Sequence, residues 1–334
     1  MNKAIKIAVD AMGGDGSPKK IIDGIIDHNK KSEASFYKIF GDKEKIQFLI
    51  NNKLDSKFFE IIHTTDLVKG TDSPLEAAKR GKKTSMWLAI ESVKKKESDV
   101  VISAGNTGAL LVIAKLNLKM IENIDKPALS ALWPNKKGMS VVLDLGANIE
   151  CSEKNLIDFT IMGSSLLKAL FPMENPKAAL LNIGSEELKG NEIIKETYKK
   201  LNILKDKDFE FKGFIEGNQL MNGEVNVIVA DGFTGNVALK TAEGTANFII
   251  GELKGAMGNS LIGKISSLLN IKNLRKFKKR LDPRLYNGAI FIGLDSPVIK
   301  SHGGTDYIGF SNSLSVCEKI IKGNLIEKIK NNIS

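Results

Sequence analysis

One local pattern recurs along the chain: a short β-branched run, then a glycine-containing loop, then a helical stretch. It occurs five times within the 334 residues. We expect the five strands at Ala4–Val9, Asp99–Ser103, Ser140–Leu145, Ala178–Ile183 and Val225–Ala230. This alternation is typical of a largely parallel sheet with helices on both faces, so it predicts an α/β fold.

Helical periodicity follows the loops. We expect helices at Gly108–Met120, Glu153–Leu170, Asn191–Leu201 and Asn236–Lys254, and further strands at Ala289–Leu294 and Pro297–Ile299. In the first unit Ser17 precedes Pro18, which predicts an N-cap and the first helical residue. No linker or low-complexity tract divides the chain, so we expect a single domain over residues 1–334, with two lobes as the alternative.

Composition limits the classes of function. Apolar residues make up 42% and charged residues 26%, which is ordinary for a globular protein. The two cysteines lie far apart, which argues against a disulfide framework or a zinc site and favours a reduced, cytosolic setting. No signal peptide and no apolar run long enough to cross a membrane is expected.

The net charge of +10 predicts anionic partners, and much of it lies in one segment. Residues 251–284 carry nine Lys or Arg residues against two acids, beside an apolar stripe at helical spacing. This basic segment favours carrier-protein docking, with peripheral membrane contact or a solvated surface as the alternatives. Its candidate contacts are Lys264, Lys272, Arg275, Lys276, Lys278, Lys279 and Arg280. We expect no nucleic-acid partner, because basic residues do not alternate with aromatic ones.

The loops carry the candidate chemistry. Glycine at a strand end lets a ligand approach backbone N–H groups, and the following helix favours anions there. The five loops are Asp10–Gly16, Ser103–Gly108, Asp144–Asn148, Asn182–Gly190 and Asp231–Asn236. Asn106, Asn148, Asn182 and Asn236 could stabilise an oxyanion, or could simply cap helices or occupy turns. Lys189, Lys240, Lys300 and His302 could hold phosphate, although most lysines are only solvated.

The fingerprints of other enzyme classes are missing. No Walker A motif, dinucleotide-binding motif, serine nucleophile elbow or zinc-protease motif occurs in the sequence. The sequence offers anion-binding loops and side-chain amides, but no recognisable nucleophile or metal site. This combination suits direct attack by a bound anion on an activated carbonyl carbon.

In these motifs the chain resembles the bacterial phosphate acyltransferases (the PlsX family), which convert acyl-ACP and phosphate to acyl phosphate. The resemblance rests on short segments in order: Val9–Asp15, Ser103–Leu110, Leu143–Asn148, Leu181–Gly184 with Glu187–Gly190, Glu216–Gly217, Asp231–Lys240 and Lys300–Gly303. It implies a three-layer α/β/α fold with a mostly parallel sheet, like the isocitrate/isopropylmalate dehydrogenase group and the phosphotransacetylases. It also implies a homodimer.

The resemblance places a set of residues on the family's site loops, and their individual roles are our inference. As catalytic residues we predict Asn106, Lys189, Asn236 and His302. As substrate-binding residues we predict Asp10, Gly13, Gly14, Gly105, Thr107, Gly108, Asn148, Glu187, Asp231, Gly235, Lys240 and Lys300. The chain departs from the family's pattern at Gly16, at Asn287 and at Asn218–Gln219.

The hypothesis that follows is acyl transfer from a long-chain acyl-ACP to inorganic phosphate. Phosphate would lie among backbone N–H groups with Lys189, Lys300 and His302, Asn106 or Asn236 would hold the oxyanion, and His302 or a lysine would protonate the leaving thiolate. No cofactor or metal is expected, because the thioester is already activated. The product would pass to a membrane glycerol-3-phosphate acyltransferase for phospholipid synthesis, with the protein in the cytoplasm or at the inner face of the plasma membrane.

Other functions fit parts of the pattern. The nearest is a phosphotransacetylase acting on a short acyl-CoA, which chain-length preference would distinguish. A basic nucleic-acid-binding protein would show salt-dependent affinity for DNA or RNA. A dehydrogenase would rest on fold analogy alone and would need aspartates arranged around a metal.

Overall fold

The centre of the structure is a single sheet of eleven strands in the order β3-β2-β1-β4-β11-β10-β5-β6-β9-β7-β8. This computed structural model describes residues 4–204, 208–258 and 268–333. Its strands are β1 Ile5–Asp10, β2 Ser35–Gly41, β3 Phe59–His63, β4 Val100–Ser103, β5 Ala128–Pro134, β6 Met139–Leu143, β7 Lys177–Asn182, β8 Glu210–Glu216, β9 Val227–Val229, β10 Ala289–Ile292 and β11 Val298–Lys300.

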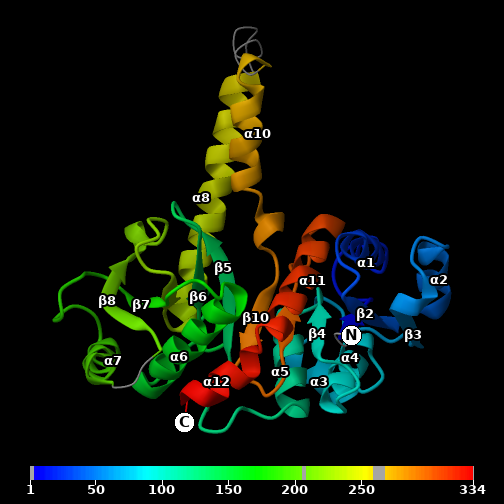
Figure 1. The fold of residues 1–334 in the computed structure, drawn as a ribbon, viewed down its shortest axis with the longest axis horizontal. Helices are drawn as coiled ribbons and strands as arrows, with labels where there is room; N and C mark the ends of the chain where they lie inside the picture. The colour runs from blue at the N-terminus through cyan, green and yellow to red at the C-terminus, as the bar shows by residue number, and fades with distance from the viewer. Residues whose placement is uncertain (1–3, 205–207, 259–267, 334) are drawn as a thin grey trace.

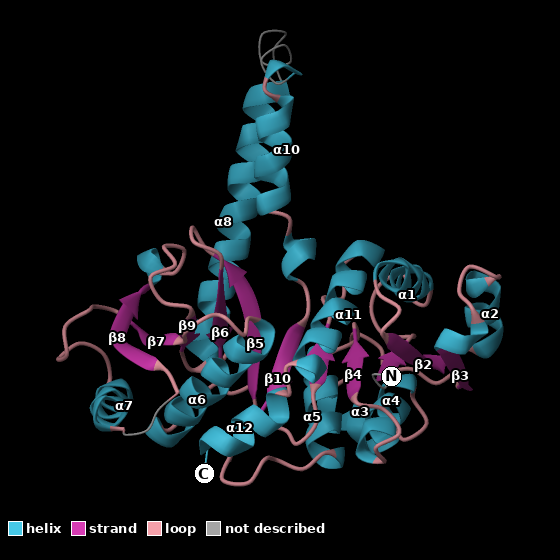
Figure 2. Cartoon of the chain, in the orientation of Figure 1, coloured by secondary structure: helices cyan, strands magenta, loops and turns pink. Residues whose placement is uncertain are grey.

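Helices follow most strands and cover the sheet (Figure 2). They are α1 Lys19–Lys31, α2 Lys43–Ile50, α3 Pro74–Arg80, α4 Ser85–Lys94, α5 Thr107–Asn117, α6 Glu153–Leu170, α7 Glu192–Ile203, α8 Gly232–Gly258, α10 Ile271–Arg280, α11 Tyr307–Lys322 and α12 Leu325–Ile333. Short 3₁₀ turns lie at Ser56–Phe58, Gly217–Gln219 and Pro283–Tyr286.

Alternating side chains divide the core between the two faces of the sheet. On β1, Ile7 and Val9 join one cluster with residues of α1, α6 and α11, whereas Ala8 joins another with residues of α4 and α5. On β6, Val142 faces a third cluster that includes residues of α8. Since successive strand residues point to opposite faces, both faces are buried, and the expected three-layer α/β/α architecture is confirmed.

Strand direction reverses in the middle of the sheet. Strands β1, β2, β3, β4 and β11 are parallel to one another, and so are β6, β7, β8 and β9. Three antiparallel pairs, β11 with β10, β10 with β5 and β5 with β6, separate these two blocks. The sheet is mostly parallel as predicted, but the two blocks run in opposite directions.

The expected elements lie close to the observed ones. Helix Glu153–Leu170 has the predicted bounds. The predicted cap of α1 was wrong: the helix begins at Lys19, and Pro18 is the capping residue. The Ser17 hydroxyl donates instead to the carbonyl oxygen of Gly13 at 2.6 Å, because the preceding loop turns back toward it.

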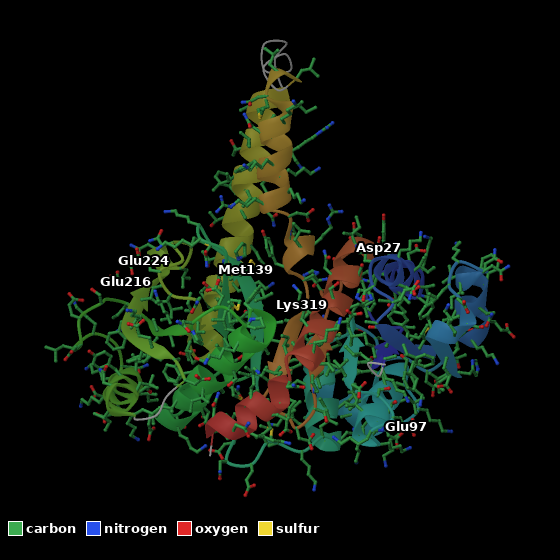
Figure 3. All side chains as sticks on the ribbon, viewed as in Figure 1. Asp27, Glu97, Met139, Glu216, Glu224 and Lys319 are labelled. Atoms are coloured by element: carbon green, nitrogen blue, oxygen red, sulfur yellow. The ribbon has the colours of Figure 1, made fainter. Side chains whose placement is uncertain are left out.

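Helices α8 and α10 extend away from the rest of the molecule (Figure 1). Most of their residues beyond Lys240 are exposed, and their side chains point outward along the projection (Figure 3). We call these two helices the projecting helices. Within the described part of the chain, no helix is both long and apolar enough to cross a bilayer.

The first turn of α8 packs closely against the loop after β6, and glycine substitutions in this helix test that packing. A Cβ atom at Gly235 would lie 2.0 Å from the Asp144 carbonyl oxygen, whereas one at Gly244 meets nothing within 4 Å. We expect Gly235→Ala to lower the free energy of unfolding by roughly 1–3 kcal/mol, because the backbone must shift. Gly244→Ala, in the same helix, should raise it by about 0.5–1 kcal/mol. Urea denaturation measures both, and equal effects would contradict the close approach.

Candidate active site

The predicted loops form two groups, which lie beyond opposite ends of the strands. The first loop group, residues 10–16, 103–108 and 300–304, follows β1, β4 and β11. The second loop group, residues 144–148, 182–190 and 231–236, follows β6, β7 and β9. Because the two strand blocks run in opposite directions, the carboxyl ends of the first block lie on the same side of the sheet as the amino ends of the second. The sequence pattern indicated the loops but not this separation.

Asp10 is the anchor of the first loop group. The residue is 1% exposed, and its carboxylate accepts hydrogen bonds from the hydroxyls of Ser85 and Ser103, both at 2.6 Å, and from the backbone N–H of Met12 at 3.2 Å. Burial raises the pKa of this carboxyl, against the lowering effect of those donors. Asp10 was predicted to bind substrate, but its oxygens are engaged in joining β1, β4 and α4.

Glycines let the loops of the first group meet backbone to backbone. A Cβ atom at Gly13 would lie 2.7 Å from the backbone nitrogen of Gly105. A Cβ atom at Gly14, whose φ is +85°, would lie 2.6 Å from the carbonyl oxygen of Ala104. Gly108 is similarly close to Pro74. These predicted residues therefore lie together, and glycine is required where the loops cross. Thr107 begins α5 and is exposed.

Two buried lysines, one within the first loop group and one on α1, contact the backbone of that group. Lys300, which was predicted, is 9% exposed, and its ammonium donates to the carbonyl oxygen of Ser301 at 2.5 Å. Lys20, which was not predicted, is also 9% exposed, and its ammonium donates to the carbonyl oxygen of Gly303. Burial, and next the charge of Lys20, lowers the pKa of Lys300 to about 8. Among the described residues, neither ammonium forms an ion pair with a carboxylate.

His302 lies beside these lysines in a fixed orientation. Its backbone N–H donates to Oδ1 of Asn287 at 2.9 Å, and its Nδ1 accepts from the backbone N–H of Gly304 at 3.2 Å. The neutral ring therefore carries its proton on Nε2. Burial, followed by the charge of Lys300, lowers the pKa of His302. Asn287, noted in the sequence only as a departure from the family, is the residue that positions this loop.

Asn106 is committed to structural hydrogen bonds. Its Oδ1 accepts from the backbone N–H of Ala109 at 3.0 Å and so caps α5. Its Nδ2 donates to the carbonyl oxygens of Gly70 and Asp72, both at 3.0 Å. Because both amide hydrogens are engaged, Asn106 would have to break these bonds to hold an oxyanion.

Asp144 is the anchor of the second loop group. It is fully buried and accepts from five donors: the backbone N–H groups of Leu129, Gly146, Ala147 and Asn148, and the side-chain amide of Asn148. The other amide hydrogen of Asn148 bonds to the carbonyl oxygen of Pro127 at 2.7 Å. Asn148, predicted to bind substrate, thus ties the loop to β5.

The remaining predicted residues of the second loop group have local partners. Asp231 accepts from both the backbone N–H and the hydroxyl of Thr234. Asn236 donates one amide hydrogen to the carbonyl oxygen of Leu145 at 2.9 Å. Glu187 accepts from the hydroxyl of Tyr198 at 2.6 Å, and Lys189 is exposed. Lys189 thus belongs to the second loop group, whereas Lys300 and His302 belong to the first.

Helix α8 connects the two loop groups. It begins beside Asp144 and carries Lys240, which forms an ion pair with Glu243 at 2.8 Å. The charges of both residues act on His302: Glu243 raises its pKa and Lys240 lowers it. The helix therefore runs from the second loop group to the neighbourhood of His302.

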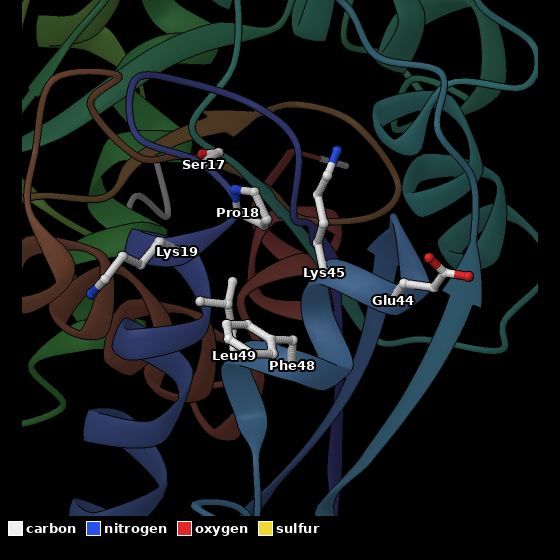
Figure 4. Close-up of a pocket in the computed structure, with 7 residues that line it drawn as sticks. All are labelled: Ser17, Pro18, Lys19, Glu44, Lys45, Phe48 and Leu49. Atoms are coloured by element: carbon white, nitrogen blue, oxygen red, sulfur yellow. The ribbon is translucent and has the colours of Figure 1, made fainter.

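An apolar hollow of about 360 Å³ borders the first loop group (Figure 4). Ser17 and Pro18 lie on one side of it, and Phe48 and Leu49 of α2 lie on the other. The side chain of Phe48 is 81% exposed. Apolar surface is therefore available within a few residues of the Gly13–Gly14 turn.

The basic segment lies mainly on the projecting helices. On α10, Lys272, Arg275, Lys276, Lys278 and Lys279 are exposed. Arg280 is already engaged, because its guanidinium donates to the carbonyl oxygens of Asn135 and Lys136, both at 3.2 Å. Lys264 lies outside the described residues.

Sequence comparison identifies the family. A family model described as "Fatty acid synthesis protein" matches residues 5–328. The phosphate acyltransferase of Pelagibacter ubique is 80% identical over 333 residues, which cover 100% of both chains. That of Rhodospirillum rubrum is 43% identical over 337 residues, covering 100% of this chain and 96% of the relative. The chain belongs to the phosphate acyltransferase family. It is therefore an acyltransferase.

Solved structures of similar fold agree with the architecture of this family member. A phosphotransacetylase from Streptococcus pyogenes has a TM-score of 0.62 at 16% identity, covering 98% of this chain and 95% of that one. EutD phosphotransacetylase from Staphylococcus aureus has a TM-score of 0.60 at 15% identity, covering 96% and 94%. At such identities the likeness shows the fold alone.

The lowered pKa of Lys300 predicts how the first loop group binds anions. Sulfate keeps two negative charges over the relevant pH range, so it is a suitable probe. We expect sulfate to raise Tm at neutral pH and to lose this effect as pH rises through about 8, where the Lys300 ammonium deprotonates. Lys300→Met should remove most of the effect at every pH. Differential scanning fluorimetry measures these shifts.

The sulfate-free protein provides the internal control. Because the folded-state pKa of Lys300 is lowered from 10.5 to about 8, the unfolded chain binds this proton more tightly. This group alone should therefore make the sulfate-free protein more stable as pH rises between those values. Sulfate stabilisation that is independent of pH would contradict the assignment.

Proposed function

We propose that this acyltransferase transfers a long-chain fatty acyl group from acyl-ACP to inorganic phosphate and releases acyl phosphate for phospholipid synthesis. The observation that carries the proposal is the buried Lys300 ammonium, without a carboxylate partner among the described residues, beside His302 and the Gly13–Gly14 turn. A buried unpaired cation is unfavourable, and a bound anion relieves that cost. The names of the relatives, phosphate acyltransferases, support phosphate as that anion.

In the proposed reaction, phosphate binds in the first loop group and attacks the thioester directly. One phosphate oxygen forms a bond to the carbonyl carbon, and the carbon–sulfur bond then breaks with its electrons leaving on sulfur. The thiolate takes a proton from Lys300 or His302. Lys300, with a pKa of about 8, is well matched to a thiol, whose pKa is ordinarily about 8.5.

The oxyanion needs a donor that is not already engaged. Both amide hydrogens of Asn106 donate to backbone carbonyls, so we no longer assign it this role. Among the described contacts Asn236 has one engaged amide hydrogen, and it lies near the start of α8, the helix that carries Lys240 and Glu243 to the neighbourhood of His302. We therefore propose Asn236 as the amide donor and leave Lys189 out of the phosphate site.

The hollow beside the first loop group supports a long acyl chain over a short one. Phe48, Leu49 and Pro18 offer apolar surface to alkyl groups, and Pro18 follows the first loop by two residues. A short acyl-CoA donor, as in a phosphotransacetylase, would leave this surface without a role. The two functions differ in their preferred donor.

The decisive assay combines palmitoyl-ACP with phosphate and follows thiol release. We expect release to require phosphate, and His302→Ala to lower kcat by about 10²-fold or more, since a positioned proton donor is lost. His63→Ala is the matched control, because His63 is exposed and outside both loop groups. Faster reaction with acetyl-CoA, and none with palmitoyl-ACP, would favour the phosphotransacetylase. Unchanged turnover of His302→Ala would remove that residue from the mechanism.

We propose that the acidic carrier protein docks on the projecting helices. The exposed lysines and arginine of α10 give a positive face, and complementary charge accelerates encounter. Ile271 and Phe277 of the same helix, and Leu281 at its C-cap, are partly exposed, so peripheral contact with the inner face of the plasma membrane is the second function we propose for it. There the product would meet a membrane glycerol-3-phosphate acyltransferase, and the enzyme would otherwise be cytoplasmic.

Charge reversal separates these roles. We expect Lys276→Glu, Lys278→Glu and Lys279→Glu together to raise the KM for acyl-ACP about 10-fold or more, because the carrier is repelled. The KM for the same acyl group on CoA should stay unchanged. If liposome binding falls while the KM for acyl-ACP does not, carrier docking on α10 is wrong.

We also propose that the protein is a homodimer. Helix α8 carries four apolar side chains, Phe233, Val237, Phe248 and Ile249, that are each more than half exposed, and exposed apolar surface suits an interface. A second copy would cover this surface. Sedimentation equilibrium tests the dimer and also checks that the charge-reversed protein keeps its assembly; a monomeric parent protein would remove the dimer from the proposal.

A further inference from the structure

Lys20 has no role in the mechanism above, yet its ammonium group contacts the first loop group. It is the second residue of α1, and its side chain reaches across the first loop to the carbonyl oxygen of Gly303. Its ammonium nitrogen lies 3.1 Å from where a Cβ atom of Gly14 would be. The side chain thus links the start of α1 to the segment that carries Lys300 and His302.

The position of Lys20 is electrostatically unfavourable in the absence of an anion. Lys20 and Lys300 are each 9% exposed, and the charge of Lys20 lowers the pKa of Lys300. Two like charges in a poorly solvated region repel each other, and each also loses hydration. Asp15 is the acid whose charge acts on Lys20, but it does not form an ion pair with it.

The hydrogen bond to Gly303 does not by itself account for a lysine here. An ammonium has three hydrogens, and among the described residues Lys20 and Lys300 each donate one, to a backbone carbonyl. The remaining donors of two neighbouring cations suit an anion with several oxygens and more than one negative charge. Phosphate at neutral pH has both properties.

We propose that Lys20 is a second ammonium of the phosphate site and binds a phosphate oxygen opposite Lys300. This inference rests on the proposed function and assigns phosphate a second ligand on α1, outside the strand-end loops. Lys20 acts on affinity for the anion rather than on the acyl donor. It also favours a doubly charged oxyanion over a singly charged one, because two ammonium groups face it.

Steady-state kinetics of Lys20→Met test the proposal. Methionine is an unbranched side chain one atom shorter than lysine, so it keeps most of the apolar stem and removes the charge. Because the variant loses a charge-assisted hydrogen bond to the anion, we expect the KM for phosphate to rise about 10- to 100-fold. The KM for the acyl donor should change little, and Lys20→Arg should recover part of the phosphate affinity. Lys30→Met, an exposed site on the same helix, is the matched control and should behave like the parent protein.

A binding measurement without turnover distinguishes failure of this inference from failure of the proposed function. We expect sulfate to raise the Tm of the parent protein and of Lys30→Met, and to lose most of that effect with Lys20→Met. If the parent protein shows no phosphate-dependent acyl transfer but Lys20→Met still loses the sulfate effect, the proposed function fails and the anion site stands. An unchanged sulfate effect, or equal changes in both KM values and kcat, would show that Lys20 is only structural.

Discussion

Two buried carboxylates need hydrogen-bond donors, and this need determines how the two loop groups fold. Asp10 lies at the end of β1 and Asp144 follows β6, and neither has more than 1% of its surface exposed. A buried carboxylate is stable only when its oxygens accept hydrogen bonds, so each one gathers the nearby backbone and hydroxyl donors. Asp10 joins α4 to the ends of β1 and β4, and Asp144 folds its own loop against β5. The loop positions depend on these contacts.

Some of the predicted residues form hydrogen bonds within the protein and so position the loops, whereas others are available to contact a ligand. Asp10, Asn106 and Asn148 are engaged with the protein. Lys300 and His302 are less fully compensated: burial and neighbouring positive charge lower the pKa of each, against the smaller raising effects of Asp10 and Glu243. An anion bound there would favour the charged forms of both residues. This difference is why we assign phosphate to the first loop group.

Much of the fold could be predicted from the sequence because it is encoded locally. The helix Glu153–Leu170 has a clear apolar periodicity and a capping box, and its predicted bounds are the observed ones. The reversal of strand direction could not be predicted, because it depends on β10 pairing with β5, about 160 residues apart in the chain. Without that pairing, the sequence leads one to expect all five glycine loops beyond the same ends of the strands, as in a fully parallel sheet. Lys20 was missed because it adjoins an apolar stripe, where a lysine usually marks the solvated side of a helix.

The central claim is that the first loop group binds the phosphate that attacks the thioester. A crystal structure of the protein grown with inorganic phosphate tests it most directly. The account predicts a phosphate ion in hydrogen-bond contact with the ammonium groups of Lys300 and Lys20, beside the Gly13–Gly14 turn. An ordered phosphate bound only at the second loop group, near Lys189, would contradict it.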